Sequence, residues 1–382
     1  MGDAGTLAES RLSGEANIGL TDSDLALFVL NVGDGDALVI RFPVEPPSTT
    51  PTYGIVDSVA GDKTIALIEA LGEAPIRFVC ATHPHLDHIR GLRKVLQRFD
   101  GKVMEFWDSG FRYTSATYRT LIEEVVRQSA SIRFIRPTSG FELIHAGAQI
   151  TVVSPSIALR NRYDTHGVDV NNASIVIRVT YPVRPPSADY PSTVAETQVA
   201  VPRSRTMILG GDAQTDAWSQ VISEFPHIDR DEKNWVRQIG GGSPVRPLAC
   251  DLFKVSHHGS KRGVNLELIE RLGDRSGGLG PSFGPPFLVG SSSTGASSSF
   301  GFPHAVTQEL LREVRDPQAQ AGGTHKRDDE LGIHFTAQQL DPAGTPAGSV
   351  AFVIRADASN DLFRFGDSTD EPVDLGRARR LL

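Results

Sequence analysis

The stretch VCATHPHLDHIRGL, residues 79–92, places three histidines and an aspartate within six positions, directly after a short apolar run. The apolar residues predict a buried strand that ends just before His83. Imidazole nitrogens and a carboxylate are ligands that zinc and other first-row divalent ions accept. The pattern of His83, His85, Asp87 and His88 therefore predicts a metal site. The alternative is a solvated, histidine-rich turn before a helix. We call residues 83–88 the histidine loop.

Two distant segments strengthen the prediction of a metal site. MILGGDA, residues 207–213, leaves Asp212 at the end of an apolar strand, and FKVSHHGS, residues 253–260, places His257 and His258 at the end of another. Taken alone, Asp212 is typical of a helix N-cap and the histidines of a packed pair. Taken with the histidine loop, they are better explained as further metal ligands, with Asp212 as a bridging carboxylate.

Composition limits the classes of protein to consider. With 382 residues, of which 39% are hydrophobic, the chain can bury a large core. The formal net charge of −8 argues against nucleic-acid binding through overall positive charge, although residues 89–99 (IRGLRKVLQRF) predict a basic helix. An aromatic content of 7% gives little support to extensive base stacking. Cys80 and Cys250 lie in apolar stretches and are expected to be buried thiols.

The ends of the chain and its polar segments predict the domain organisation. Residues 1–22 read as a flexible N-terminal arm without the basic-then-apolar order of a secretion signal, so we expect a cytoplasmic protein. No apolar run approaches the roughly 18–20 residues that span a bilayer. We expect one domain over residues 23–360, with insertions near 183–205 and 226–248, and a C-terminal tail over 361–382.

Strands and helices alternate along the first part of the chain. Apolar runs predict strands within 25–42, at 52–57 and at 76–83, while helical periodicity marks 62–74, 89–99 and 118–129. Potential ligands stand repeatedly at strand ends. This order predicts an α/β fold whose strands are buried between helical layers, with a site built on the loops at one edge.

Several motifs, taken in their order along the chain, resemble those of the metallo-β-lactamase fold superfamily. More narrowly, they resemble the hydrolase domain of the ComEC/Rec2 family of competence proteins. The resemblance covers about residues 26–355. It is carried by LNVGDGDALVI (30–40), GIVDSV (54–59), THPHLDHIRGL (82–92), NNASIVIRV (171–179), MILGGDA (207–213), FKVSHHGS (253–260) and SFGFPH (299–304).

The resemblance implies an αββα sandwich of two facing mixed sheets flanked by helices, with a dinuclear metal site at one edge. It implies that one ion is held by His83 and His85, the other by Asp87 and His88, and that Asp212 bridges them. One of His257 and His258 completes the second site. Zinc and manganese are the expected metals, with magnesium as an alternative.

One segment departs from the wider superfamily. Many dinuclear members supply a third histidine to the first ion, upstream of the bridging aspartate. Here that region reads DTHGVDVNNASIVIRV, residues 164–179, and Asn171 or Asn172 aligns with the position better than His166. The first ion is therefore expected to be weakly held, or completed by an asparagine oxygen and water.

The resemblance favours a metal-dependent phosphodiesterase or nuclease that cleaves a phosphodiester with a metal-bridging hydroxide. Nucleic acid, or a nucleotide-like diester, is then the expected partner. The catalytic residues that it implies are Asp87, Asp212 and His304. Further candidates either support a ligand from behind or contact the substrate, and these are Asp36, Asp57, Asn171, Asn172 and Lys261. Asp36 has an alternative as a turn former, and Lys261 as a solvated lysine.

Two other functions stay open. One is a cytoplasmic small-molecule hydrolase of the same fold, acting on a phosphoester or thioester. β-Lactamase activity is disfavoured because the third histidine and an export signal are both missing. The other is a module gated by a protein partner, for example in an anti-phage operon. DNA uptake is not inherited from the competence proteins, because this chain has none of their transmembrane segments. The oligomeric state is left open.

Overall fold

A computed structural model describes residues 18–111, 113–166, 169–183, 204–226, 247–273, 286–292, 298–315, 326–336, 348–366 and 373–381. The two predicted insertions, near 183–205 and 226–248, lie outside these residues except at their edges. Within the described residues, no helix is long and apolar enough to cross a membrane.

The first sheet has nine strands in the order β16-β15-β14-β1-β2-β3-β4-β5-β6. β1 pairs antiparallel with both β2 and β14, whereas β3 to β6 run parallel to one another. The strands are β1 (Leu25–Val29), β2 (Ala37–Phe42), β3 (Thr52–Ser58), β4 (Ile76–Ala81), β5 (Glu105–Asp108), β6 (Arg133–Ile135), β14 (Ser349–Ile354), β15 (Asn360–Phe365) and β16 (Arg379–Arg380).

The second sheet has seven strands in the order β13-β12-β11-β10-β9-β8-β7. β10 to β13 are parallel, and β7 to β10 are antiparallel. The strands are β7 (Glu142–His145), β8 (Ala148–Ser154), β9 (Val176–Tyr181), β10 (Arg205–Leu209), β11 (Leu252–Lys254), β12 (Phe287–Gly290) and β13 (Ile333–Phe335).

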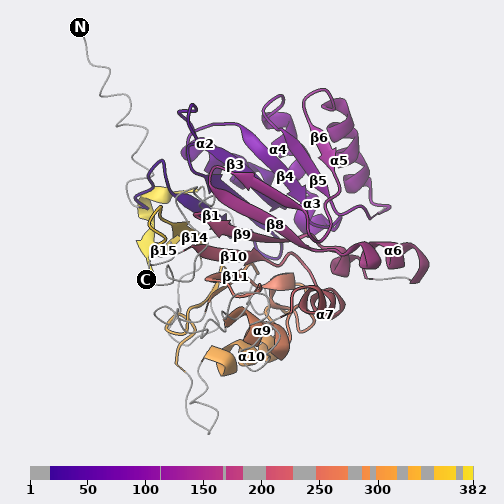
Figure 1. The fold of residues 1–382 in the computed structure, drawn as a ribbon, viewed down its shortest axis with the longest axis vertical. Coiled ribbons are helices and arrows are strands. Elements are labelled where there is room, and N and C mark those ends of the chain that lie inside the picture. Colours follow the sequence, from indigo (N-terminus) through magenta and orange to yellow (C-terminus); the bar gives the residue numbers. More distant parts are fainter. Residues whose placement is uncertain are drawn as a thin grey trace, which may run out of the picture.

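Helices cover the outer face of each sheet, as Figure 1 shows. The first sheet is covered by α2 (Gly61–Ala70), α4 (Leu92–Arg98) and α5 (Ala116–Arg127), with the short α3 (Leu86–Ile89) beside them. The second is covered by α7 (Thr215–Glu224), α9 (Leu266–Gly273) and α10 (Ala305–Arg315), and α6 (Ile157–His166) projects at one end. In the described part of the chain, 3₁₀ turns occur at η1 (Val170–Ala173), η5 (Ser256–Gly259) and η8 (Leu375–Arg377). The predicted sandwich of two mixed sheets flanked by helices is confirmed.

The strand sequences explain these layers. Every residue of β1 (LALFV) is buried. Leu25, Leu27 and Val29 pack between the two sheets, while Ala26 and Phe28 pack beneath the helices of the first sheet. Because both faces of such a strand are covered, it reads as a continuous apolar run rather than an alternating one.

Both predicted domain boundaries need correction. Ile18 and Leu20, within the predicted N-terminal arm, are buried in the core beneath the first sheet. At the other end, β15 begins at Asn360 and pairs with β14 along its full length. Residues 360–365 therefore belong to the sheet and not to a tail, because the exposed edge of β14 needs a hydrogen-bonding neighbour.

The basic helix predicted at 89–99 is α4, and its cations face acidic residues of neighbouring helices. Lys94 Nζ lies 2.6 Å from Asp62, and an amino group of Arg98 lies 2.7 Å from Glu69. Arg98 also hydrogen-bonds Glu73. The remaining cation of α4, Arg93, lies 3.8 Å from Glu124. The cations of α4 therefore each lie beside a carboxylate, as in a solvated charged face.

Candidate metal centre

The histidine loop begins where the sequence predicts, because β4 ends at Ala81. His83 and His88 are fully buried, whereas His85 is partly exposed. His83 Nε2 and His85 Nδ1 lie 3.1 Å apart. The loop then turns into α3, whose first turn carries Asp87 and His88. Four potential ligands are thus fixed by one strand end and one helical turn.

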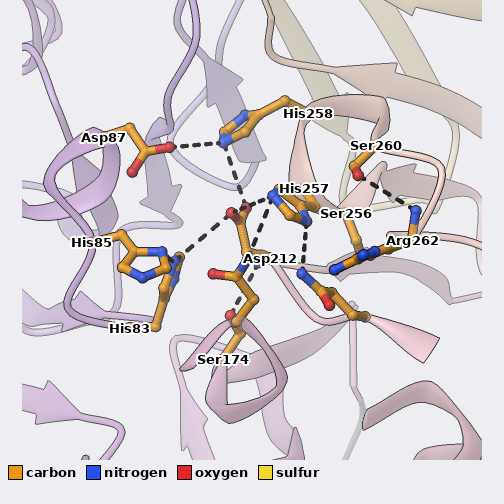
Figure 2. A network of polar contacts seen from close by, with 12 residues as sticks. His83, His85, Asp87, Ser174, Asp212, Ser256, His257, His258, Ser260 and Arg262 are labelled. Atoms are coloured by element: carbon orange, nitrogen blue, oxygen red, sulfur yellow. Dashed lines mark hydrogen bonds and ion pairs between the residues drawn. The ribbon is translucent and has the colours of Figure 1, made fainter. Parts of the chain in front are cut away.

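Asp212 lies at the centre of the site (Figure 2), one residue past the glycine pair that follows β10. Its Oδ1 is 3.1 Å from His88 Nε2 and 3.5 Å from His258 Nε2. Its Oδ2 is 3.8 Å from His83 Nε2 and 3.7 Å from His257 Nε2. Each carboxylate oxygen therefore faces two imidazoles.

The alternative role of Asp212 as a helix N-cap does not hold. The N-cap of α7 is Gln214, and the backbone N–H of Asp212 donates to Ser174 Oγ at 3.1 Å. The neighbouring glycines are required by close contacts: a side chain on Gly211 would press against Ser174 and Thr82 at 3.2–3.4 Å, and Gly211 has a φ of +49°. The backbone is thus shaped to bring the Asp212 carboxylate to the histidines.

His257 and His258 lie in η5 with φ of 50° and 53°, a left-handed conformation that strains a residue with a side chain. The two rings consequently diverge. His258 Nε2 lies 3.6 Å from Asp87 Oδ2, whereas His257 Nε2 lies 3.5 Å from Asn171 Nδ2. The sequence left open which histidine belongs to the second site. In the structure His258 lies next to Asp87, whereas His257 faces Asp212 Oδ2, as His83 does.

One candidate half-site consists of Asp87, His88, Asp212 and His258, which each offer a ligand atom within 4.8 Å of the others. His88 Nε2, Asp212 Oδ1 and His258 Nε2 are buried without a hydrogen-bond partner. A buried polar atom left in this state costs about 1–3 kcal/mol, and a bound cation removes the cost. This donor set of imidazoles and carboxylates suits a first-row divalent ion.

The other candidate half-site gathers around Asp212 Oδ2, with His83, His85 and His257. Asn171 adjoins it, and its buried Oδ1 has no hydrogen-bond partner. Asn172 has a different position: its Oδ1 accepts from the backbone N–H groups of Gln214 and Ala217 at the start of α7. Of the two asparagines, Asn171 is the one with an unpaired buried oxygen next to this half-site. The side chain of His166 lies outside the described set.

Asp57 supports the histidine loop from behind. It accepts hydrogen bonds from Thr82 N at 2.8 Å and from Thr82 Oγ1 at 2.6 Å, and its Oδ2 lies 2.7 Å from His88 Nδ1. The last contact fixes the ring of His88 so that Nε2 points to Asp212.

Asp36 does not accept the hydrogen bond expected from a ligand histidine. Its oxygens lie 3.6 Å from His258 Nδ1 and 4.0 Å from His88 Nδ1, beyond hydrogen-bond range. Asp36 instead forms a buried ion pair with Lys254 at 2.6 Å and accepts from Ser291 Oγ. The backbone oxygen of Ser291 lies 2.8 Å from His258 Nδ1. Sequence reasoning missed Ser291, although it too follows a buried strand.

The electrostatics favour neutral imidazoles at His83 and His257, protonated ones at His88 and His258, and an ionised Asp212. Burial holds the pKa of His83 and of His257 below the usual range. Burial also opposes charge on His88 and His258, but the attraction of Asp212 and the other carboxylates leaves the pKa of both raised. Burial would raise the pKa of Asp212, yet the surrounding histidines lower it well below its ordinary value. A cation would displace the protons that now balance this carboxylate.

His304 and Lys261 lie further from the cluster. The His304 ring packs against Phe302, and its Nδ1 accepts from the backbone N–H of Lys261 at 3.0 Å. Phe302 in turn packs against His257 and His258. The exposed side chain of Lys261 borders a small groove that it shares with Glu309 and Glu313. The roles predicted for His304 and Lys261 stay predictions.

Residues 50–185 match the family model described as the metallo-beta-lactamase superfamily. That segment runs from β3 through the histidine loop to β9, and it includes Asp57 and four of the potential ligands. The chain has a metallo-β-lactamase fold. A search of curated proteins gave no match.

Solved structures similar to this metallo-β-lactamase fold share little sequence with it. The long form RNase Z from yeast is 10% identical over 50% of this chain and 30% of that one, with a TM-score of 0.28. The metallo-beta-lactamase fold protein YhfI from Bacillus subtilis is 13% identical over 50% of this chain and 64% of that one (TM-score 0.27). CmlA, a diiron beta-hydroxylase from Streptomyces venezuelae, is 13% identical over 83% of this chain and 53% of that one (TM-score 0.33). The chain thus spans less than two thirds of each, and these values carry no information on its substrate.

Proposed function

We propose that the protein is a metal-dependent phosphodiesterase or nuclease with a dinuclear site. The observation that carries the proposal is the position of Asp212, whose two carboxylate oxygens each face a separate pair of imidazoles. A carboxylate placed in this way is suited to hold two cations together. Zinc or manganese fits the donor set. Magnesium is the less suited alternative, because it prefers oxygen ligands and the site has few of them.

In this proposal one ion would be held by His83, His85 and His257. The other would be held by Asp87, His88 and His258, and Asp212 would contribute to both. Such ions acidify bound water and stabilise negative charge on an attacked phosphorus. The chain's own contribution is orientation. Asp57 fixes His88, and Ser291 fixes His258, so that each presents Nε2 to the centre. Asp87 is a third exposed and borders the opening of the cluster.

The choice of a phosphodiester over other substrates of this fold rests on the resemblance to the ComEC/Rec2 hydrolase domain. The resemblance is carried by the ordered motifs around Asp36, the histidine loop, Asp212 and His257–His258. A small phosphoester or thioester is the alternative substrate, and a protein partner that gates the site is compatible with either.

The experiment is hydrolysis by metal-stripped protein, reloaded with Zn²⁺, Mn²⁺ or Mg²⁺. The substrates are single-stranded DNA, duplex DNA, RNA and bis-p-nitrophenyl phosphate. We expect metal-dependent cleavage. Asp212→Ala should lower the cleavage rate by at least about 100-fold, because both ions lose a ligand. Asp216→Ala, an exposed aspartate on α7, is the matched control and should leave the rate unchanged. Two bound metals without cleavage of any of these substrates would contradict the proposal.

A further inference from the structure

An aromatic side chain borders the centre on the side of the histidine loop. The ring of Tyr113 meets that of His85 edge-on, with centroids 5.4 Å apart. Tyr113 is 36% exposed, so part of this side chain is accessible to a ligand. It precedes α5, and the hydroxyl of Ser115 caps that helix by accepting from Tyr118 N. The position of Tyr113 beside His85 is therefore fixed by the start of a helix.

A second aromatic group contacts His257 and His258. Figure 2 shows these two histidines across Asp212 from His83 and His85. Phe302 is buried, and its ring centroid lies 5.5 Å from that of His257 and 5.8 Å from that of His258. Phe300 stacks on Phe302 at 5.5 Å and is 63% exposed. Phe302 thus links an exposed aromatic face to the candidate ligands.

The loop that carries Phe300 is held in place by hydrogen bonds. Ser298 Oγ accepts from Phe300 N at 3.2 Å and from Phe302 N at 2.9 Å. Ser299 N donates to Asp34 Oδ2, in the turn between β1 and β2, at 3.2 Å. An apolar ring that is both fixed and exposed loses little conformational entropy when it receives a flat ligand.

Beyond Tyr113 the surface opens into a groove of about 780 Å³ along α5 and β6. This volume is in the range of about 300–1,000 Å³ found for ligand sites. Its lining includes Tyr118, Phe134, Arg119 and Arg136. Phe134 is 40% exposed, and the guanidinium of Arg136 lies over its ring at 5.2 Å. We call this the α5 groove.

The charged groups of the α5 groove favour an anionic ligand. Arg119 is mostly exposed and only 3.9 Å from Glu123, and Arg136 is half-exposed and 3.3 Å from Asp108. The Arg119–Glu123 pair is exposed and weak, so the Arg119 guanidinium can turn to phosphate. Asp108 is buried, so Arg136 keeps its Nε contact with that carboxylate and offers its terminal amino groups to a ligand. Proteins bind unpaired nucleotides by stacking bases on aromatic rings and by pairing phosphates with neighbouring arginines.

We propose that the substrate is an unpaired nucleic-acid strand, with bases stacked in the α5 groove and on Phe300, and with the phosphodiester between them at the metal centre. This inference rests on the proposed function and narrows it to a substrate class. Bases in a duplex are stacked on one another and cannot reach these rings. The overall negative charge of the chain does not oppose the binding, because stacking and two local arginines supply it.

The first test measures binding without cleavage. Full-length protein, stripped of metal, is titrated into a single-stranded oligonucleotide that contains 2-aminopurine, whose fluorescence is quenched by stacking. We expect Phe300→Ala and Phe134→Ala each to weaken binding by about 5- to 150-fold, the range measured for loss of one base–aromatic contact. Phe300→Tyr should bind as the parent does. Ile144→Ala, at an exposed apolar residue of β7, is the control and should change nothing.

The second test measures cleavage by the metal-loaded protein. An oligonucleotide with abasic positions on both sides of one phosphodiester should be cut there at least about 5-fold more slowly than the parent oligonucleotide. Phe134→Ala should reduce cleavage of the strand but not of bis-p-nitrophenyl phosphate. Unchanged binding and cleavage in both phenylalanine variants would overturn the inference while leaving the phosphodiesterase proposal intact. Stacking-dependent binding without any metal-dependent cleavage would support the strand-binding surface and contradict the proposed reaction.

Discussion

His257 is the residue whose position changes the interpretation of the site most. The sequence shows no third histidine upstream of Asp212, and it therefore predicts a weak first half-site. The structure places His257 Nε2 3.7 Å from Asp212 Oδ2, on the same side as His83. Two successive left-handed residues turn neighbouring histidines to opposite oxygens of one carboxylate. Such a conformation is rare for residues with a side chain, and a sequence pattern does not reveal it.

We predict that His257→Ala selectively weakens one of the two metal sites. Loss of one imidazole from a set of four ligands should reduce the affinity of that half-site by at least about 10–100-fold, comparable to the loss of a residue that orients a ligand. Metal content after dialysis, measured by mass spectrometry, should fall from two ions per chain toward one. His304→Ala is the control and should retain both ions. Equal loss of both ions from His257→Ala would contradict the separate assignment of the two histidines.

At the scale of elements, α2 and α4 approach each other through glycines. A β-carbon on Gly91 would lie 2.7 Å from the backbone oxygen of Ser58 and even closer to the backbone of Gly61. Gly91 itself has an ordinary helical φ of −90°. This contact holds the end of the histidine loop against β3, which carries Asp57.

We predict that Gly91→Ala destabilises the protein by about 2–3 kcal/mol, because backbone atoms cannot move aside for a methyl group. Gly101→Ala is the comparison. Gly101 has a φ of +75° and no atom within 4 Å of the added carbon, so only backbone strain of about 1–2 kcal/mol is expected there. Urea unfolding measures both free energies. A smaller loss for Gly91→Ala than for Gly101→Ala would contradict the close-packing explanation.

Glu124 joins α5 to α4 through a buried carboxylate. Gln97 and Gln128 each donate to it at 2.9 Å, and Arg127 donates at 2.7 Å. Burial alone would raise the pKa of Glu124, but these donors lower it to about 2. A lowered pKa in the folded state means that the ionised group stabilises the fold above its unfolded pKa near 4.5, and that this stabilisation is lost as the pH falls toward 2.

We therefore predict that Glu124→Gln lowers the free energy of unfolding near pH 7 by on the order of 1 kcal/mol. The difference from the parent protein should shrink as the pH falls from about 4.5 to about 2. Urea unfolding at a series of pH values measures it. Glu123→Gln, at an exposed neighbour, should show almost no difference. A difference that does not change with pH would show that the carboxylate's charge is not responsible.

The sequence predicts elements better than it predicts contacts between them. Apolar runs locate β1, β4 and β10, because strands covered on both faces are mostly apolar; Arg77 in β4 and Arg205 in β10 are only partly buried. The histidine loop and Asp212 follow from the ends of these strands. Some contacts join residues that are far apart in the chain or that stand in no recognisable sequence motif. Examples are the ion pairs of α4 with α2 and the contact of Tyr113 with His85. No local signal in the sequence marks these contacts.

The whole molecule depends on its C-terminal strands. β14 and β15 lie in the first sheet, and β14 pairs with β1 near its middle. Phe363 and Phe365 of β15 are buried against the core beneath the helices, where Phe365 packs edge-on against Phe28. The residues expected to form a tail are therefore part of the main hydrophobic core.

We predict that a chain truncated after Ser359 does not fold to a stable state. It would lose β15, including burial of aromatic side chains worth about 3–5 kcal/mol each, and leave the edge of β14 open to aggregation. A chain truncated after Gly366 keeps β15 and should remain folded, with a reduced melting temperature. Circular dichroism and size-exclusion chromatography distinguish the two. A cooperative unfolding transition in the shorter chain would contradict the role assigned to β15.

The position of β14 between β1 and β15 also has a consequence for the nascent chain during synthesis. On the ribosome, the histidine loop emerges long before Asp212, His257 and His258, and β14 and β15 follow later still. At about 5–20 residues per second, these events are separated by about 5–25 seconds each. Until synthesis reaches β14, β1 lacks its second neighbour and the first sheet is incomplete. The chain therefore acquires the full set of ligands before it acquires the sheet that holds half of them, and loading with metal is expected to follow release from the ribosome.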